Sequence, residues 1–229
     1  YDFCNEDLSM YYLDMVKGRR YTYGADSLER RAVQTALYEI LHVLVRMMAP
    51  LLVFTAEEIW QAMPKSENDQ LVTSVHLADF PKISPLYAQH DLKSLGGKSI
   101  DEELKPVFDI LPDVAKVLED IRSQGIIGSS FDAKIILLTK SAERYTFLRS
   151  LQGDLAEIFK VSEVVVRQQE NAAPGAQPSL ACAGLAIAAG KADGEKCVRC
   201  WNYFHSLSGD KVHSAICSNC VRAIEGGIH

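Results

Sequence analysis

The sequence predicts a multidomain fold in which an all-α helical bundle is followed by a small α/β (α+β) unit and then by a short cysteine-rich module. Apolar residues recur at three- and four-residue steps near the start of the chain, short β-branched runs alternate with helical patterns in the middle, and two Cys-x-x-Cys pairs lie near the end. We expect the bundle at residues 1–64, a connector at 65–99, the α/β unit at 100–190 and the module at 191–229.

The first part of the chain has the pattern of amphipathic helices. Residues 7–20 form the first such segment, and Gly18 should weaken its end. One side of this segment carries Leu8, Tyr11, Tyr12, Met15 and Val16. A longer helix should follow the N-capping sequence at residues 26–29. Its apolar stripe consists of Val33, Leu37, Ile40, Leu41, Leu44 and Met48.

Prolines divide the next part of the chain. Pro50 should end the long helix, and residues 55–58 form a capping box for a short helix that carries Trp60 as a core residue. Pro64 should stop that helix. Because residues 65–99 are punctuated by prolines and a Gly-Gly pair, we expect them to form an irregular connector.

The middle of the chain combines one long helical pattern with strand patterns. The helical pattern covers residues 100–124, where Pro106 and Pro112 predict a kink or a later start. Gly125 should end it. The pattern then changes to short β-branched runs, which indicates a small α/β or α+β arrangement.

Three strands are expected after this helix. Residues 134–139 and 161–167 are rich in β-branched side chains, and a helix capped by Ser141 should lie between them. Residues 168–182 are polar and contain Pro and Gly, which indicates a mobile loop. Residues 184–190 fit a third strand.

Two cysteine pairs, Cys197-Val-Arg-Cys200 and Cys217-Ser-Asn-Cys220, lie near the end of the chain. Each pair places two thiolates on one side of a backbone turn, so together they supply a closed tetrahedral set of soft ligands for one zinc ion per chain. Because no position stays open for water, the pattern indicates a structural site of the zinc-ribbon type. The alternative is two disulfides, which a chain without a secretory signal favours less.

The other possible ligands fit the pattern less well. Cys4 and Cys182 have no partner at ligand spacing, and we expect both to be small buried apolar residues. His205 and His213 can in principle replace a thiol, but four cysteines already complete the tetrahedron.

The composition is that of a globular protein with an acidic balance. The 229 residues carry a net charge of −6, which argues against a surface coated in basic charge but leaves room for a local basic patch. No run of eighteen apolar residues occurs, so we expect no membrane span. The N-terminus, Tyr1-Asp2-Phe3-Cys4, does not have the features of a signal peptide, and free thiols favour a reducing cytoplasm. We expect the chain to begin inside a folded region.

The cysteine module carries a clear family resemblance. The stretch Glu-Lys-Cys-Val-Arg-Cys-Trp-Asn-Tyr at residues 195–203, together with Cys-Ser-Asn-Cys-Val-Arg-Ala-Ile at 217–224, closely resembles the zinc-bearing tail of bacterial-type isoleucyl-tRNA synthetase. Residues 74–81 and 127–130 are similar to other segments of the same enzyme. The zinc tail favours isoleucine over the related enzymes for valine and leucine.

The helical part supports the same resemblance more broadly. Residues 7–14, 31–34 and 49–60 look like the anticodon-binding domain of the class I synthetases for isoleucine, valine and leucine. The chain departs from the family at Lys17-Gly18-Arg19, where Lys-Asp-Arg is usual, and at the two prolines noted above. A local change of backbone is expected there rather than a different fold. The resemblance covers nearly the whole chain.

The resemblance implies a tRNA-binding part of a longer ligase. The catalytic signatures of the family, His-Ile-Gly-His and Lys-Met-Ser-Lys-Ser, are absent from this sequence, so we expect no catalytic residue here and no aminoacylation by this chain alone. The implied partners are isoleucine tRNA and the catalytic and editing domains of the same enzyme. DNA and membranes are not among them.

Basic residues beside aromatic ones are the candidates for RNA contact. Lys17, Arg19 and Arg20 precede two tyrosines at the end of the first helix, and Arg30 follows them. Such a cluster can bind phosphates while the tyrosines stack on unpaired bases. The alternative is that these cations only complement a helix C-terminus. Arg30 and Arg31 face the same choice, and Arg31 could simply pair with nearby acids.

A second candidate group lies in the cysteine module. Arg199, Trp201 and Arg222 are close to the metal ligands in the sequence, and an exposed Trp beside Arg suits stacking under a base. Alternatively, Trp201 covers the metal site as a miniature core. We favour a core role for part of the ring and RNA contact for the two arginines.

Two other function classes compete with tRNA binding. A zinc-ribbon module that binds protein would use the helical bundle as a docking surface, and the acidic net charge supports it. A DNA-binding zinc finger is disfavoured because no recognition helix with basic residues is expected after the cysteine pairs.

Overall fold

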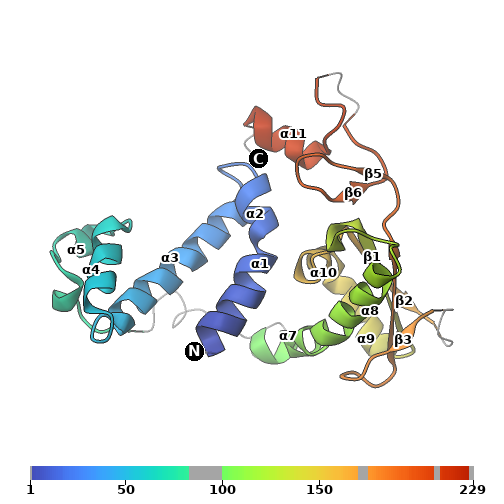
Figure 1. Ribbon diagram of the computed structural model, residues 1–229, viewed down its shortest axis with the longest axis horizontal. Helices are drawn as coiled ribbons and strands as arrows, with labels where there is room; N and C mark the ends of the chain where they lie inside the picture. The colour runs from blue at the N-terminus through green and yellow to red at the C-terminus, as the bar shows by residue number, and fades with distance from the viewer. Residues whose placement is uncertain (1, 83–99, 170–174, 209–211, 227–229) are drawn as a thin grey trace. The chain divides into compact units, whose positions relative to one another are not determined.

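The computed structural model describes residues 2–82, 100–169, 175–208 and 212–226. Helices come first, a small mixed sheet follows, and a cysteine-rich segment comes last, as the chain order in Figure 1 shows. The predicted fold class is therefore confirmed. By its contacts the chain divides into two compact units, residues 1–30 with 98–229, and residues 31–97.

The N-terminal segment is helical over twenty residues, but its winding is unusual. It consists of three consecutive pieces, η1 (Phe3–Tyr12), α1 (Leu13–Met15) and α2 (Lys17–Thr22). Gly18 does not end the helix. Because η1 has the wider i→i+5 winding, a stripe spaced for an α-helix does not stay on one side. Val16 is buried, whereas Tyr11 of the same predicted apolar side is 40% exposed.

The long helix α3 (Leu28–Met48) begins and ends where the sequence predicts. The Ser27 hydroxyl accepts a hydrogen bond from the Arg30 amide at 3.2 Å, which satisfies one free donor of the first turn. The helix ends two residues before Pro50. Val33 and Val45 are its buried residues.

The unit of residues 31–97 packs around Trp60. Its further elements are α4 (Val53–Ala62), α5 (Glu67–Gln70) and η2 (Val75–Leu77). Trp60 is fully buried, as predicted, and its indole N–H donates to the Val72 carbonyl at 3.2 Å. Helix α4 begins two residues before Thr55, so the predicted capping box is wrong; Leu52 stands at the N-cap without a side-chain bond.

A buried acid fixes part of the predicted connector. Asp69 accepts hydrogen bonds from His42 at 2.9 Å, Arg46 at 2.7 Å and Ser66 at 2.5 Å. Residues 65–82 contain two short helical turns, α5 and η2, and are otherwise irregular. The remainder of the predicted connector lies outside the described residues.

The predicted kink between the two prolines is present. Helix α7 (Ile100–Asp109) contains Pro106, and α8 (Leu111–Ser123) starts after a break at Ile110. Pro112 occupies the first turn of α8, where a missing N–H leaves no helical bond unmade.

The sheet has four strands in the order β2-β1-β4-β3. The central strand β1 (Ala133–Thr139) pairs in parallel with β2 (Glu163–Gln168) and antiparallel with β4 (Leu185–Lys191). These are the three predicted strands. The short β3 (Gln177–Pro178) lies in the segment that was expected to be a loop, and pairs with β4; residues 170–174 of that segment lie outside the described part.

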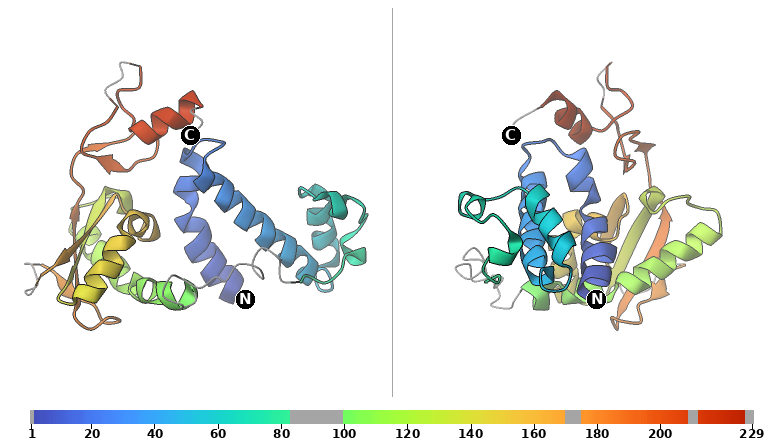
Figure 2. Two further views of the ribbon diagram at one scale, coloured as in Figure 1. Left: turned by 180° about the vertical axis from the view of Figure 1, so that it is seen from behind. Right: turned by 60° about the vertical axis from the view of Figure 1, so that its left-hand side comes forward.

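Helices cover the sheet. α9 (Ala142–Ser150) and α10 (Gln152–Ile158) connect the two parallel strands, and α8 packs against β4 (Figure 2). Ser141 caps α9 as predicted, because its hydroxyl accepts a hydrogen bond from the Arg144 amide. The short α10 was not predicted. Helix and strand side chains meet in one apolar cluster that includes Val114, Leu118, Ile135, Leu137, Leu155 and Val164.

None of the helices in the described part of the chain has the length and hydrophobicity that a membrane span requires.

Candidate metal centre and nucleic-acid interface

Two local structures bring the four predicted ligands together. The hairpin of β5 (Glu195–Lys196) and β6 (Tyr203–Phe204) encloses the first cysteine pair, and the Trp201 amide donates to the Cys197 carbonyl at 2.9 Å to close the turn. Cys217 stands at the N-cap of α11 (Ser218–Glu225), and Cys220 lies in the first turn of this helix. A hairpin and a helix start therefore present one thiol pair each.

The sulfur positions fit a metal ion. The Sγ atoms of Cys197 and Cys220 are 3.8 Å apart, as are those of Cys200 and Cys217, and all four Sγ atoms lie within 4.8 Å of one another. Ligands about 2.3 Å from a tetrahedral zinc ion would be separated by roughly 3.8 Å, whereas a disulfide requires about 2.05 Å. The four thiols are free. The geometry thus favours the metal over the disulfide alternative.

Electrostatics also favours a cation at this position. Burial raises the pKa of Cys200 well above its usual range, with the neighbouring thiolates adding to the rise, and burial likewise raises the pKa of Cys217 to about 11. Burial acts on Cys197 in the same direction, but backbone N–H groups that include those of Cys200 and Cys217 hold its pKa at about 6. Four thiolates in one cluster repel one another, and a divalent cation offsets that repulsion.

A small apolar cluster surrounds the sulfurs, and Trp201 is not part of it. Ile216 is buried there, with Phe204, Leu207 and Val221 packed against it. Trp201 is 60% exposed, so most of its ring lies in solvent, and a core role for the rest of the ring stays a prediction. The residue has a φ of +67°, because the chain must turn sharply after Cys200. This left-handed conformation is costly for a bulky side chain.

Helix α11 was not predicted from the sequence. This helix begins within the second cysteine pair, and Arg222 is its single basic residue, so it is not a recognition helix with several basic residues. Recognition helices of DNA-binding zinc fingers contact several successive bases. One arginine offers little for that purpose, and DNA binding remains disfavoured.

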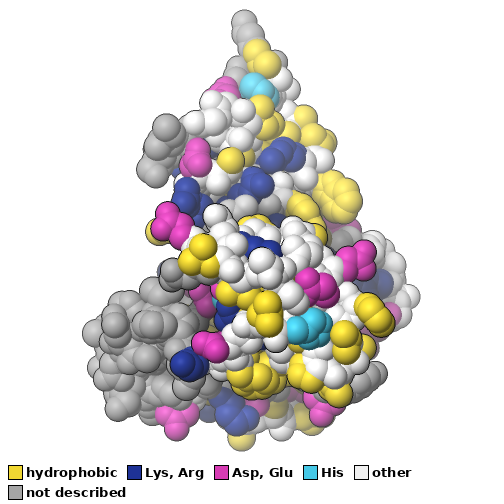
Figure 3. Space-filling model, turned by 90° about the vertical axis from the view of Figure 1, so that its left-hand side faces the viewer, with side chains coloured by type: hydrophobic (Ala, Val, Ile, Leu, Met, Phe, Trp, Pro, Cys, Tyr) yellow, Lys and Arg dark blue, Asp and Glu magenta, His cyan; other side chains and the backbone are white. Residues whose placement is uncertain are grey.

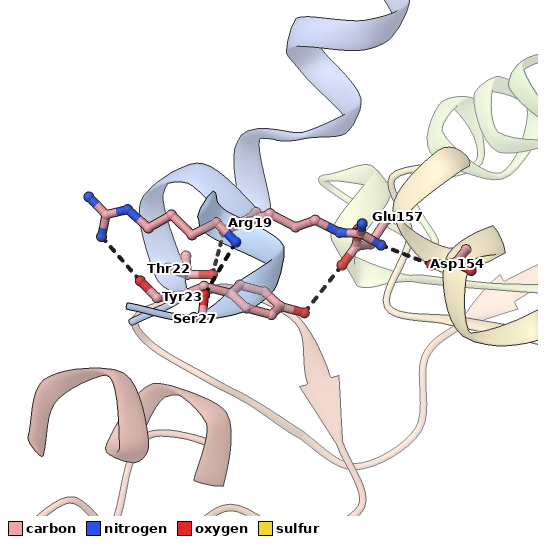
Figure 4. A network of polar contacts seen from close by, with 8 residues as sticks. Arg19, Thr22, Tyr23, Ser27, Asp154 and Glu157 are labelled. Carbon is pink, nitrogen blue, oxygen red and sulfur yellow. Dashed lines mark hydrogen bonds and ion pairs between the residues drawn. The ribbon is translucent and has the colours of Figure 1, made fainter. Parts of the chain in front are cut away.

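Ion pairs hold most of the first basic cluster. Arg19 donates from Nε to Glu157 at 2.5 Å and from Nη2 to Asp154 at 2.9 Å, which ties α2 to α10 (Figure 4). Lys17 pairs with Asp14 at 2.5 Å. Both cations are therefore paired with acids of the same chain, which the sequence did not predict for them.

Arg20 differs from its neighbours. It is exposed, and its guanidinium lies 5.0 Å from the ring centroid of Tyr21, which is also exposed. A cation beside an exposed aromatic ring keeps the combination that suits a nucleotide.

Arg30 and Arg199 both donate to the backbone at the end of α2. Arg30 donates to the Tyr23 carbonyl at 3.3 Å, and Arg199 donates to the Thr22 carbonyl at 2.5 Å. The same Nη1 atom of Arg199 lies 3.4 Å from the Cys220 sulfur. In contrast, Arg222 is exposed and bonds to Asn219 of its own helix.

The sequence pointed to Tyr23 as an RNA contact but did not reveal the acids that complete these contacts. Tyr23 donates to Glu157 at 3.3 Å, and burial together with Glu157 raises the pKa of Tyr23 to about 12. Lys160 pairs with Asp14 at 2.5 Å. These partners lie more than 130 positions apart, and no local pattern connects them.

A hollow of about 490 Å³ lies beside these contacts. Tyr23, Phe131, Lys160 and Arg222 line it, but so do several acidic side chains. Its mixed charge does not single out an anionic ligand.

The two remaining cysteines differ from expectation in part. Cys4 is exposed, so the prediction of a buried residue is wrong, whereas Cys182 is half-buried beside the apolar cluster of the sheet.

Comparison with known proteins gives consistent matches. A family model described as the anticodon-binding domain of tRNA ligase matches residues 1–137, and one described as the zinc finger found in FPG and IleRS matches residues 194–223. Isoleucine–tRNA ligases are similar throughout: the protein from Caldanaerobacter subterraneus subsp. tengcongensis is 40% identical over 225 residues, that from Thermoanaerobacter sp. (strain X514) 41% over 223, and that from Geobacter sulfurreducens 38% over 224. The alignments cover 97–98% of this chain but only 22–23% of those proteins.

Proposed function

Because this chain belongs to the family of anticodon-binding domains of tRNA ligases, we propose that it binds the anticodon region of isoleucine tRNA and holds one structural zinc ion. The observation that carries the proposal is the pairing of this family match with a four-thiol cluster at the place where the zinc-finger match falls. The proposed reaction of the whole protein is ATP-dependent ligation of isoleucine to its tRNA. This chain contributes binding and supplies no catalytic group.

The proposed zinc ligands are Cys197, Cys200, Cys217 and Cys220. Four protein thiolates leave no open position, so the ion shapes the module and takes no direct part in chemistry. The proposal includes a cytoplasmic location, where thiols stay reduced and available to the metal.

The exposed members of the basic set are the proposed direct RNA contacts. Arg20, Trp201 and Arg222 are exposed, so their side chains are accessible to RNA. A stacked base and neighbouring phosphates would suit these groups.

The other candidates are proposed to act in support. Lys17, Arg19, Arg30 and Arg199 already contact acids or carbonyls within the chain. Their contacts would stabilise the local structure of the RNA-binding surface, and their charges would add positive potential beside it.

The remaining domains of the ligase are the proposed protein partners. Apolar side chains lie exposed in the unit of residues 31–97, where Leu51 is 85% and Phe54 89% exposed. Figure 3, which looks onto the side of α4 and α5, shows hydrophobic side chains at the surface there. Such groups suit burial against another domain.

Binding of labelled tRNA under a salt titration tests the proposal. Trp201→Ala should weaken binding by roughly tenfold if one base stacks on the ring, and Arg222→Gln should reduce the slope of log affinity against log salt by about 1. Arg122→Gln is the matched control, because this arginine pairs with Glu119 on α8, away from the proposed contacts.

The result also separates the rival functions. Equal affinity for isoleucine and valine tRNAs would leave anticodon binding but remove the isoleucine assignment. No salt-dependent binding to any tRNA would favour a protein-docking module instead.

A further inference from the structure

The Arg199 side chain lies between the metal centre and the end of α2. Its Nη1 donates to the Thr22 carbonyl at 2.5 Å and lies 3.4 Å from the Cys220 sulfur. These two acceptors belong to segments almost 200 residues apart. Because the side chain is half-buried, the contacts are shielded in part from water.

The Thr22 carbonyl is an acceptor that needs a partner. Thr22 is the last residue of α2, and the final carbonyls of a helix have no intrahelical donor and carry partial negative charge. A guanidinium from another segment satisfies both needs. The turn that leads from α2 into α3 begins here.

Three other contacts hold the same turn, but they do not involve the module. Arg19 and Tyr23 both bond to Glu157 on α10 (Figure 4). Arg30 closes the turn by donating to the Tyr23 carbonyl. The turn is therefore attached at one point to the α/β part and at another to the cysteine module.

The position of Arg199 depends on the metal-binding turn. It lies between the ligands Cys197 and Cys200, so its backbone is fixed when these two residues close around an ion. We infer that Arg199 links the metal centre to the turn between α2 and α3, so that zinc binding orders residues 22–27. This inference rests on the proposed zinc site. It makes Arg199 a positioning residue that connects the metal to the proposed RNA-binding surface.

Hydrogen exchange of the full chain, with and without zinc, tests the link. In the wild type, zinc removal should speed exchange of amides in residues 22–27 on the order of tenfold, the effect expected for losing one hydrogen bond to a charged group. In Arg199→Gln the zinc-loaded protein should already exchange at the faster rate, and zinc removal should add little. Arg149→Gln removes the same charge from α9, where the guanidinium donates to Gln152, and should behave as wild type.

A second variant separates the two attachments of the turn. Arg19→Gln should speed exchange in residues 22–27 while leaving the response to zinc in place, because its partners lie on α10. Elemental analysis and exchange of the β1 amides accompany every sample, so a general loss of folding is recognised.

The outcomes are distinct. Wild type that binds no zinc refutes the proposed metal site itself. Wild type that binds zinc without any change in residues 22–27 refutes the link. An Arg199→Gln variant that keeps a full response to zinc also refutes it, and one that no longer binds zinc shows that Arg199 supports the ligands rather than the turn.

Discussion

The α/β part and the cysteine module are held together by different forces. The α/β part buries eighteen residues in one apolar cluster, whereas the module buries four, three of which are cysteines. A core of four residues removes too little apolar surface from water to offset the entropy of ordering the chain. The difference indicates that the sheet folds by apolar burial and the module by ligand binding.

Polar contacts join these two regions. Lys196 pairs with Asp132 at 2.7 Å, and the Tyr203 amide donates to the Ser162 hydroxyl at 2.7 Å. Contacts of this type contribute about 1 kcal/mol each. They can orient the module without making the two regions one cooperative unit.

Zinc removal should give the largest difference between the regions. Structural zinc sites contribute roughly 10–16 kcal/mol of apparent binding free energy, and that energy is coupled to folding of the site. A strong chelator should therefore unfold the chain from about residue 191 onward. The amides of β1 and those of α3 near residues 30–48 should stay protected.

Hydrogen exchange with and without the chelator measures this effect. Metal content before treatment should be one zinc per chain. Equal loss of protection in β1 and in the module would show that the two regions form one unit, and the comparison drawn above would fail.

Truncating a core side chain of the sheet should instead destabilise the α/β part and leave zinc binding intact. Leu137 is fully buried in β1, so Leu137→Ala should destabilise the α/β part by about 3–5 kcal/mol. Denaturant unfolding followed by far-UV circular dichroism reports this loss. The zinc content of the folded variant should remain unchanged. Leu180→Ala is the matched control, because Leu180 is highly exposed and should cost little.

A single added methyl group should damage the module alone. Gly194 has a φ of +92°, and a Cβ there would lie 2.1 Å from the Phe204 carbonyl oxygen. Gly194→Ala should therefore displace the β5–β6 hairpin at a cost of about 2–3 kcal/mol. Competition with a zinc indicator should show weaker binding. Gly153→Ala, where a Cβ meets open space, should bind zinc as the wild type does.

The sequence predicts the regions with strong local patterns. The helix α3, the β-branched runs of β1 and β2, and the spacing of the two cysteine pairs each follow from a few neighbouring residues, and the structure has these elements where expected, although only Val33 of the predicted α3 stripe is buried. Short elements such as α10 and α11 were missed, since seven or eight residues give too little periodicity to detect.

Contacts between distant residues were beyond sequence reasoning. Arg19 was a candidate for RNA binding because of its neighbours in the chain, but its charge is paired with Glu157, which folding brings beside it. Trp201 was expected to cover the metal partly, but the conformation of one backbone turn leaves the ring exposed. For both Arg19 and Trp201, the sequence gives the type of side chain. It does not give the residues that surround the side chain in the folded protein.

On acidification, the cysteine module and the α/β part should lose their structure at different pH values. We expect this test to involve the smallest free-energy change of the four. Hydrogen bonds from the Ser179 hydroxyl at 2.6 Å and from two backbone amides lower the pKa of Asp113 below its ordinary value of 3.8. Because the folded state lowers this pKa, the ionised Asp113 stabilises the fold at pH values above 3.8. This stabilisation is lost as the pH falls below 3.8 and through the folded-state pKa. On acidification, zinc dissociates at a pH above that at which Asp113 is protonated, because protons compete with the metal for the thiolates.

We therefore expect two steps on acidification, zinc release first and loss of the α/β part second. Asp113→Asn should cost about 1 kcal/mol at neutral pH, because the amide oxygen still accepts a hydrogen bond, and should change only the second step. Asp109→Asn is the control, since Asp109 pairs with Lys105 at the exposed surface of α7. A zinc indicator and far-UV circular dichroism follow the two steps in one titration. A change in zinc release caused by Asp113→Asn would mean that the sheet supports the metal site directly, because Asp113 touches the loop before β4 and none of the four thiols.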